Sequence, residues 1–304
     1  MPSYSDIYKE IKKIKNVKSF KDEALSRHTT LRIGGPADIL VMPKDLEALQ
    51  EVLRVTSGIK KYVFGNGSNL LIPDNGLKGV VIKISGGMNS FECNERFVTV
   101  GAGTLMQSLI KKLASLGLSG LEFAACVPAA IGGAIVMNME AFGEETGSIV
   151  EYAEILDRDG KVKKLSRSDL SFSYRKSNIK HCILISAMLK LNYKQKHIIK
   201  KRLDEIILKR KELQPMSVPS AGSVFKNPKD VPAGKLIDMA GCKGLRVGGA
   251  EVSKKHANFI INLGDAKAND VKTLIRKVKS EVKQKFKVEL ELELVDSSKL
   301  NMLF

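Results

Sequence analysis

The residues most able to do chemistry gather in the segment 221–228. It contains a serine, Ser223, next to Gly222 and closely followed by the cation Lys226 and the amide Asn227. A nucleophilic serine needs an adjacent base or a strained G-x-S-x-G turn, and no such turn surrounds any serine of this sequence. A serine held by a glycine turn in a basic setting can instead give a proton to a reacting carbon. The segment therefore weakens the nucleophile interpretation and leaves proton donation as the alternative role of Ser223.

Two glycine-containing segments could hold an anion. Consecutive main-chain N–H groups in such turns can form an anion-binding nest, and glycine lets a diphosphate approach closely. Two such segments suit an elongated dinucleotide better than a mononucleotide. The residues concerned are Gly65, Asn66, Gly67, Ser68 and Asn69 in the first segment, and Ala130, Gly132 and Gly133 in the second, which covers residues 126–134. A tight β-turn and close strand packing are the alternatives that need no ligand.

The second half of the chain contains two further kinds of candidate catalytic side chain, an arginine and a row of glutamates. Arg175 can fork onto a carboxylate, although the sequence alone favours an ordinary surface arginine. Glu289, Glu291 and Glu293 alternate with leucines, and a period of two places all three carboxylates on one face of a strand. We expect at least two of them to form a wet acidic face. The third can act as a general acid if it enters a cleft that raises its pKa.

Composition describes an ordinary water-soluble globular chain. It has 304 residues, enough for one large domain or roughly two to three small ones. The net charge of +17 comes from lysines scattered along the chain, without basic blocks or an aromatic-basic RNA motif. A solvated surface is therefore expected, with no nucleic-acid partner. A nucleic-acid-binding protein remains the alternative from a different functional class.

Cysteine spacing and hydropathy indicate the cellular compartment in which the protein works. The four cysteines lie far apart and form no C-x-x-C pair, so no metal site and no disulfide framework are expected, and a reducing cytoplasm fits. The N-terminus lacks the apolar core of a signal peptide. The longest uncharged run, residues 123–139, is interrupted by proline and glycines, so no membrane span is expected.

The hydrophobic periodicity predicts an α+β fold. A β-α-β pattern in the first eighty residues comprises helices at 4–15 and 45–56 and strands at 37–41, 62–64, 70–72 and 80–84. A mixed, β-rich stretch follows, with strands at 97–101, 135–138 and 181–191, a helix at 104–116 and a hairpin of 150–156 with 161–164. A helix at 194–213 then leads to helices at 234–240 and 269–286 and strands at 245–252, 258–262 and 288–295.

Together these segments resemble the UDP-N-acetylenolpyruvoylglucosamine reductase family of bacterial flavoenzymes. The resemblance runs from about residue 29 to residue 294, and it rests on the order and spacing of several motifs rather than on one. The chain is similar to the shorter subclass, because the spacing between Arg175 and Ser223 leaves no room for a long Tyr-bearing insertion. The motifs are residues 28–38, 65–70, 120–123, 174–177, 220–228, 241–253 and 255–259.

The resemblance implies a two-part FAD-binding domain of the vanillyl-alcohol-oxidase type and a C-terminal α+β substrate-binding domain. The expected division is 1–80 together with the tail 295–304, then 81–193, then 194–294. The implied reaction is NADPH-dependent reduction of UDP-N-acetylglucosamine enolpyruvate through non-covalent FAD. Ser223 aligns with the family's proton donor to C2, and Arg175 and Glu293 align with the groups that stabilise the enolate. A register slip of two residues would nominate Glu291 in place of Glu293.

Further residues and properties follow from the same resemblance. The glycine segments and Asn138 are expected to bind FAD, and Lys226, Asn227 and Lys255 to bind the substrate. A metal-free monomer of the bacterial cytoplasm is expected, serving peptidoglycan synthesis and hence cell shape and division.

The chain departs from the family pattern at two places. Pro128-Ala129-Ala130 stands where the family usually has Pro-Gly-Ser or Pro-Gly-Thr, and Glu140 and Glu144 stand where it has glycines. Added carboxylates near a diphosphate would repel it if they point inward. The departures bear on FAD affinity rather than on the reduction chemistry. They leave a degenerate, non-catalytic relative as an alternative. A flavin oxidase of the same fold is another, disfavoured because no histidine lies near either glycine segment in the sequence.

Overall fold

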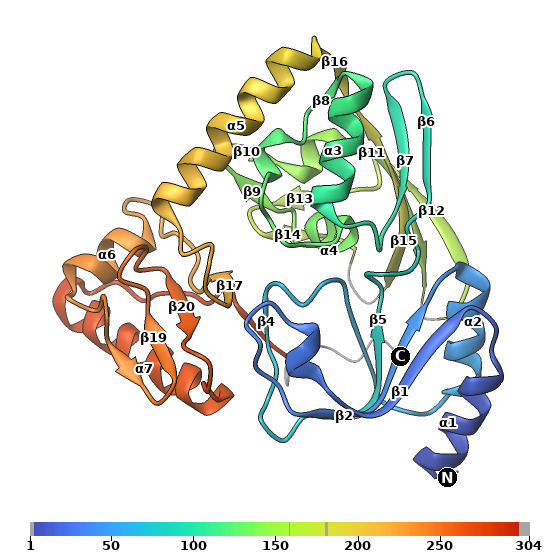
Figure 1. Cartoon of the computed structure of the whole chain (residues 1–304), viewed down its shortest axis with the longest axis horizontal. Coiled ribbons are helices and arrows are strands. Elements are labelled where there is room, and N and C mark those ends of the chain that lie inside the picture. Colours follow the sequence, from blue (N-terminus) through green and yellow to red (C-terminus); the bar gives the residue numbers. More distant parts are fainter. Residues whose placement is uncertain (1–2, 158, 180–181, 298–304) are drawn as a thin grey trace.

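The structure is a computed structural model that describes residues 3–157, 159–179 and 182–297 (Figure 1). The described residues form three larger sheets in succession along the chain, each with its own helices. No helix in these ranges is both long enough and apolar enough to cross a membrane.

The first sheet confirms the predicted β-α-β pattern. Its strands have the order β1-β2-β5-β3, and β2, β5 and β3 run parallel. Strand β1 was not predicted, because its polar sequence lacks the alternation of a half-buried strand; it pairs antiparallel with β2 at the sheet edge. The elements are α1 (Tyr4–Lys13), β1 (Val17–Ala24), β2 (Pro36–Pro43), α2 (Leu46–Val55), β3 (Lys61–Phe64), β4 (Leu70–Leu71) and β5 (Leu77–Lys83).

The second sheet is antiparallel, with the order β12-β11-β15-β7-β6. The predicted hairpin of β11 and β12 is confirmed, as is the helix α3, which ends at Gly117 with a left-handed φ of 74°. The larger elements are β6 (Phe91–Asn94), β7 (Phe97–Gly101), α3 (Met106–Leu116), α4 (Ile131–Val136), β11 (Val150–Leu156), β12 (Val162–Ser166) and β15 (Ile183–Lys190). Short strands between them are β8 (Leu118–Ser119), β9 (Glu140–Ala141), β10 (Glu144–Glu145), β13 (Phe172–Ser173), β14 (Lys176–Ser177) and β16 (Asn192–Tyr193).

The strand predicted at 135–138 is wrong, because residues 131–136 form the helix α4. Its buried side chains include Ile131, Ala134 and Ile135, which is the spacing of one helical face. Gly132 lets this helix pack against the end of β7, since a Cβ there would lie 2.7 Å from the Cβ of Ala102. Of the glycines that suggested a turn and strand, Gly132 thus serves close helix packing.

The third sheet has the order β17-β20-β19-β18 and is joined to the second sheet by α5, which runs along one edge of the molecule (Figure 1). The strand predicted at 288–295 is wrong. Residues 288–294 run extended with one bridge, from Leu292 to Phe225, before β21 (Val295–Asp296) pairs with β4. This segment crosses from the third sheet to the first, so it has no continuous strand edge beside it. The elements are α5 (Lys196–Leu213), β17 (Ser220–Ser223), α6 (Ala233–Met239), β18 (Arg246–Val247), β19 (Ala250–Val252), β20 (Phe259–Asn262) and α7 (Ala268–Phe286).

Two hydrophobic clusters explain how the parts are held. One cluster runs continuously from α1 through the first and second sheets. The other fills the third part and also includes Leu31, Ile33 and Leu71 from the first part. Leu290 and Leu294 belong to this second cluster, so the crossing segment 288–294 lies where the first and third parts pack together.

Candidate active site

Ser223 ends strand β17, in a turn shaped by glycine. Gly222 has a left-handed φ of 75°, and the pairing of β17 with β20 is irregular between Ser220 and Ser223. The Ser223 side chain is half-buried, and its Oγ has no hydrogen-bond partner in the described part of the chain. In these ranges the Ser223 hydroxyl therefore has no hydrogen-bonded base.

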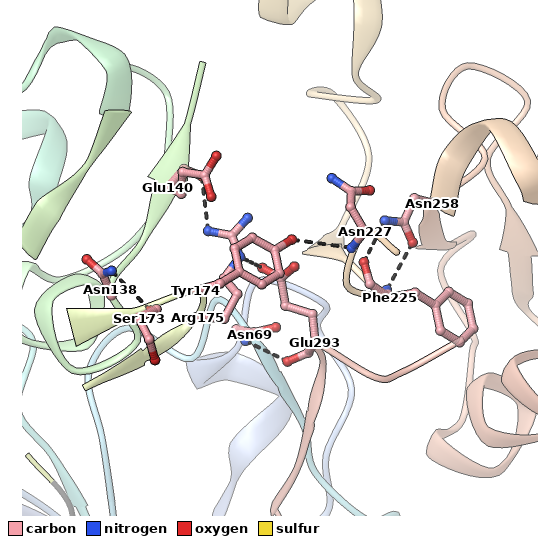
Figure 2. Close-up of polar contacts among 10 residues, drawn as sticks. All are labelled: Asn69, Asn138, Glu140, Ser173, Tyr174, Arg175, Phe225, Asn227, Asn258 and Glu293. Atoms are coloured by element: carbon pink, nitrogen blue, oxygen red, sulfur yellow. Dashed lines mark hydrogen bonds and ion pairs between the residues drawn. The ribbon is translucent and has the colours of Figure 1, made fainter. Parts of the chain in front are cut away.

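Asn258 fixes the chain directly after Ser223. Its main-chain oxygen accepts a hydrogen bond from Val224 N at 2.9 Å. Its side-chain Oδ1 accepts from Phe225 N at 2.9 Å, and its Nδ2 donates to Phe225 O at 2.8 Å (Figure 2). Only 3% of Asn258 is exposed. It lies within the motif 255–259, but nothing in the sequence alone revealed this clamp.

Arg175 and Glu293 come together from different parts of the chain. Arg175 Nε lies 2.9 Å from Glu293 Oε1, and their side chains are 15% and 14% exposed. The Nε–H bond does not point at a hydrogen-bond acceptor, so this contact is an ion pair rather than an aligned hydrogen bond. Arg175 Nη1 donates to the main-chain oxygen of Glu140 at 3.0 Å. Figure 2 shows Arg175 between Glu140 and Glu293.

The main chain around Glu293 sets its distance from Ser223. Glu293 N donates to Val224 O at 2.9 Å, and Asn69 Nδ2 donates to Glu293 O at 3.0 Å. Glu293 is thus tied both to the residue after Ser223 and to the first glycine segment. By contrast, the Glu291 side chain is 75% exposed and pairs with Lys226 Nζ at 3.1 Å. Of these two carboxylates, only Glu293 is turned into the junction.

The electrostatic surroundings of Glu293 favour its protonated form. Burial is the largest influence and raises its pKa, and the carboxylate of Glu140 raises it further. The charge and contact of Arg175 lower the pKa, as does the charge of Lys226, but the net direction is upward. A carboxyl group in this setting can carry a proton at a higher pH than an ordinary glutamate.

The predicted substrate-binding residues have protein contacts of their own. Asn227 N donates to Tyr174 Oη at 3.3 Å, a contact that crosses the junction beside Arg175 (Figure 2). Asn227 Oδ1 accepts from Ala233 N at 3.1 Å and so supports the start of α6. Lys255 Nζ donates to the main-chain oxygen of Lys211 in α5. Asn227 therefore lies near the Arg175 group, whereas the described contact of Lys255 is with α5.

The two glycine segments, separate in sequence, lie against each other. Asn66 Nδ2 donates to Pro128 O at 2.6 Å. A Cβ on Gly65 would come within 3.2 Å of the Cβ of Ala130, whereas a Cβ on Gly133 would meet no heavy atom within 4 Å. The two segments thus pack together, and the main chain is open to solvent at Gly133, which is exposed. This open main chain fits a diphosphate that approaches the backbone closely.

Gly67 makes a close contact with His28 that bears on the argument against a histidine tether. Its φ is 66°, and a Cβ there would lie 2.4 Å from the main-chain oxygen of His28. The fold thus brings a histidine beside the glycine loop, which the sequence-based argument against a histidine tether did not foresee. The His28 ring itself lies 3.0 Å from Glu23 Oε1 and 3.4 Å from Lys83 Nζ.

Asn138 is fully buried and its amide is used by the protein. Its Nδ2 donates to Glu145 Oε2 at 2.8 Å and to Ser173 O at 3.1 Å, and its Oδ1 accepts from Gly147 N at 2.8 Å. The φ of Asn138 is 43°, a left-handed value that asparagine tolerates well. The side chain therefore fixes the loop that leads into β9.

Arg210 is a buried cation that the sequence-based search missed. It is 8% exposed, burial lowers its pKa, and its Nε has no hydrogen-bond partner. Its Nη2 reaches the main-chain oxygen of Phe123 at 3.5 Å, just before the second glycine segment. No carboxylate lies within ion-pair distance of Arg210 among residues 3–157, 159–179 and 182–297. A buried guanidinium without a carboxylate suits an anionic group nearby.

The two carboxylates that replace family glycines have different surroundings. Glu140 contributes to the electrostatics of Glu293, and Glu144 pairs with Arg202 of α5. No cluster of three or more metal-ligating side chains occurs in the described ranges. The site therefore combines a glycine-rich surface that fits a dinucleotide with a serine, an arginine and a buried carboxyl group at the junction.

Residues 37–166 match the FAD binding domain family, and with the reductase relatives described below this match defines the class as an FAD-dependent oxidoreductase. Residues 214–295 match the C-terminal domain of UDP-N-acetylenolpyruvoylglucosamine reductase. The expected α+β fold, an FAD-binding part followed by a separate C-terminal domain, is confirmed.

Full-length relatives identify the family. A UDP-N-acetylenolpyruvoylglucosamine reductase of Bacillus licheniformis is 41% identical over 94% of this chain and 96% of its own length. One of Halalkalibacterium halodurans is 42% identical over 90% of this chain and 92% of its own length. The crystal structure of UDP-N-acetylenolpyruvylglucosamine reductase from Thermus caldophilus has a TM-score of 0.80, with 38% identity over 92% of this chain and 98% of that one. The chain belongs to the UDP-N-acetylenolpyruvoylglucosamine reductase family.

Proposed function

We propose that this protein reduces UDP-N-acetylglucosamine enolpyruvate to UDP-N-acetylmuramate with NADPH as hydride donor and non-covalent FAD as redox cofactor, in peptidoglycan synthesis. The observation that carries the proposal is the meeting of Arg175, Glu293 and the Ser223 turn at one junction. Family membership over nearly the whole chain agrees with it.

The three residues have distinct proposed roles. Arg175 holds the substrate carboxylate with its fork-shaped cation, since planar guanidinium groups match carboxylate geometry. Glu293, in its protonated form, donates a hydrogen bond to the enolate oxygen that develops charge. Ser223 gives its proton to C2. Bound FAD supplies the hydride that reaches C3.

The remaining binding roles are also proposals. We assign FAD binding to Gly65, Asn66, Gly67, Ser68, Asn69, Ala130, Gly132, Gly133 and Asn138. The close fit of the two segments and the open space over Gly133 support this assignment. The buried amide of Asn138 acts through the loop it fixes. Lys226, Asn227 and Lys255 are assigned to the substrate. The contact of Asn227 with Tyr174, next to Arg175 in the chain, and the contact of Lys226 with Glu291 support the first two, while Lys255 rests on the family resemblance.

The organisation and cellular setting complete the proposal. We divide the chain into 1–80 with the tail 295–304, 81–193 and 194–294, and the pairing of β21 with β4 supports the place of the tail's first residues. The protein acts as a monomer in the bacterial cytoplasm, and its product serves cell shape and division. Substrate reduction is favoured over the oxidase and non-catalytic alternatives, because Ser223, Arg175 and Glu293 are all present in a chain with reductase relatives at 41% identity.

A spectroscopic experiment tests the function. Purified protein is reconstituted with FAD, reduced with NADPH without oxygen, and mixed with UDP-N-acetylglucosamine enolpyruvate. We expect NADPH to bleach the flavin absorbance, and the enolpyruvyl compound to restore it with formation of UDP-N-acetylmuramate. UDP-N-acetylglucosamine, which lacks the enolpyruvyl group, serves as the control ligand. Protein that stays colourless with added FAD, or reduced flavin that responds only to oxygen, would overturn the proposal.

A further inference from the structure

Arg175 already has a carboxylate partner within the protein. Its Nε lies 2.9 Å from Glu293 Oε1, both side chains are largely buried, and its Nη1 is held by the main-chain oxygen of Glu140. A substrate that brings its own carboxylate to Arg175 therefore adds a second carboxylate to a guanidinium that Glu293 holds. Two carboxylates that share one cation in a poorly solvated site repel each other.

The groups around Glu293 offer little to neutralise this added charge. From β9, Glu140 adds a further negative charge, and its influence raises the pKa of Glu293. From the segment after β17, Lys226 is the other cation near Glu293, but its Nζ is 3.1 Å from Glu291 Oε2. Tyr174 is a neutral phenol beside Arg175, and Asn69 contacts only the main-chain oxygen of Glu293. A second anion bound beside Glu293 would therefore raise its pKa and favour protonation of its carboxylate.

We propose that binding of the substrate carboxylate at Arg175 is coupled to uptake of one proton by Glu293. This inference rests on the proposed function. The proton comes from solvent and forms an O–H bond on the Glu293 carboxylate, so the negative charge that the substrate brings is balanced by one positive charge. No bond of the substrate breaks in this step.

The coupling prepares the site for the reaction. Once protonated, Glu293 is a hydrogen-bond donor that no longer competes with the substrate for Arg175. The same proton-bearing oxygen can then contact the enolate oxygen as charge develops there. Substrate binding would itself create the acid form that the reaction uses, so a permanently protonated glutamate is not required.

The pH dependence of the coupling has a defined form. Below the pKa of Glu293 in the free enzyme the group already carries a proton, so no uptake occurs. Above its pKa in the complex the group stays ionised in both states, so again no uptake occurs. Proton uptake therefore appears only between these two pKa values, and substrate affinity falls as pH rises through that window.

Titration calorimetry measures the coupling directly. Oxidised holoenzyme is titrated with UDP-N-acetylglucosamine enolpyruvate, without NADPH so that no turnover occurs, in buffers with different heats of ionisation. We expect the binding heat to depend on the buffer, with an uptake of roughly one proton per substrate at the centre of the window. UDP-N-acetylglucosamine, which lacks the carboxylate, should bind without this dependence.

Variants locate the proton. Glu293→Gln should abolish the uptake. Glu140→Gln should move the window to lower pH, because it removes a charge that raises the pKa of Glu293. Glu289→Gln, an exposed residue of the same segment, is the matched control and should behave like wild type.

The outcomes separate this inference from the function on which it rests. Failure of the enolpyruvyl compound to bind or to be reduced would overturn both. Binding and turnover with a heat that does not depend on the buffer would overturn the coupling alone. The same would follow if Glu293→Gln took up as many protons as wild type.

Discussion

Arg175 Nε and Glu293 Oε1 lie 2.9 Å apart, although Arg175 lies between the short paired strands β13 and β14 and Glu293 precedes β21 near the end of the described chain. The contact is possible because residues 288–294 cross from the third sheet to the first. Glu293 is further tied to Val224, directly after Ser223. The crossing segment thus aligns residues from two separate parts in one site.

Gly133 provides a test of the cofactor surface. A Cβ at this position meets no heavy atom within 4 Å, and its φ is not left-handed, so Gly133→Val should leave the protein folded. The added side chain would occupy the open space that we assign to FAD. We expect the dissociation constant for FAD to rise at least roughly tenfold, since lost backbone approach and steric conflict act together. Fluorescence titration with FAD, alongside thermal unfolding of the cofactor-free variant, checks this. Unchanged FAD affinity would place the cofactor elsewhere.

The choice between Glu293 and Glu291 predicts different kinetics. Glu293→Ala should lower kcat by roughly 10²- to 10³-fold, because it removes a donor to the developing charge. Glu291→Ala should change kcat by less than about fivefold, since an exposed ion pair contributes little. Steady-state kinetics with the enolpyruvyl substrate compare the two. The reverse order of effects would show that the sequence register is shifted by two residues.

Burial of Glu293 predicts a dependence of stability on pH. Its folded-state pKa is raised above the ordinary value of 4.5, so the folded protein binds more protons than the unfolded chain in the interval above that value. Wild-type stability from this group is fully present below 4.5 and is lost as pH rises through the folded pKa. Glu293→Gln lacks this dependence. Thermal unfolding at a series of pH values should show that the stability of the variant relative to wild type increases with pH. A difference that stays constant, or moves the other way, would contradict the raised pKa.

Asn258 should matter for stability as much as for geometry. Asn258→Ala would leave both the N–H and the C=O of the buried Phe225 without their partners. Each unsatisfied buried group costs about 1–3 kcal/mol, so we expect a loss of roughly 2–6 kcal/mol in the free energy of unfolding. Urea unfolding measures this, with the exposed Asn94→Ala as control, expected within about 0.5 kcal/mol of wild type. Equal stability of the two variants would show that the hydrogen bonds of Asn258 to Phe225 do not stabilise the fold.

The sequence predicted most of the fold where local periodicity decides structure. Helices α1, α2, α3 and α7 have clear apolar faces or strong capping and glycine signals, and α5 is a long charge-rich stretch. The positions of all five were predicted to within a few residues. The prediction from the sequence failed where tertiary contacts determine the local structure. Helix α4 forms because Gly132 fits against Ala102, and segment 288–294 is extended without a full strand partner because it crosses between sheets.

In the candidate site, too, some residues could be predicted from the sequence and others could be found only in the folded structure. Residue type drew attention to Ser223, whereas the resemblance to the family was needed to select Arg175 and to choose Glu293 among three glutamates. Asn258 and Arg210 were missed as functional candidates. Their importance comes from hydrogen bonds to main-chain atoms distant in sequence and from burial, neither of which a local pattern reveals. The contact of Gly67 with His28 likewise appears only in the folded chain.

The most direct test of the central claim is the Ser223→Ala variant followed through its two half-reactions by anaerobic stopped-flow spectroscopy. Loss of the proton donor should leave flavin reduction by NADPH within about twofold of wild type, and should slow reoxidation by UDP-N-acetylglucosamine enolpyruvate by at least roughly 10²-fold. Equal slowing of both half-reactions, or reoxidation at the wild-type rate, would contradict the role of Ser223 as the proton donor.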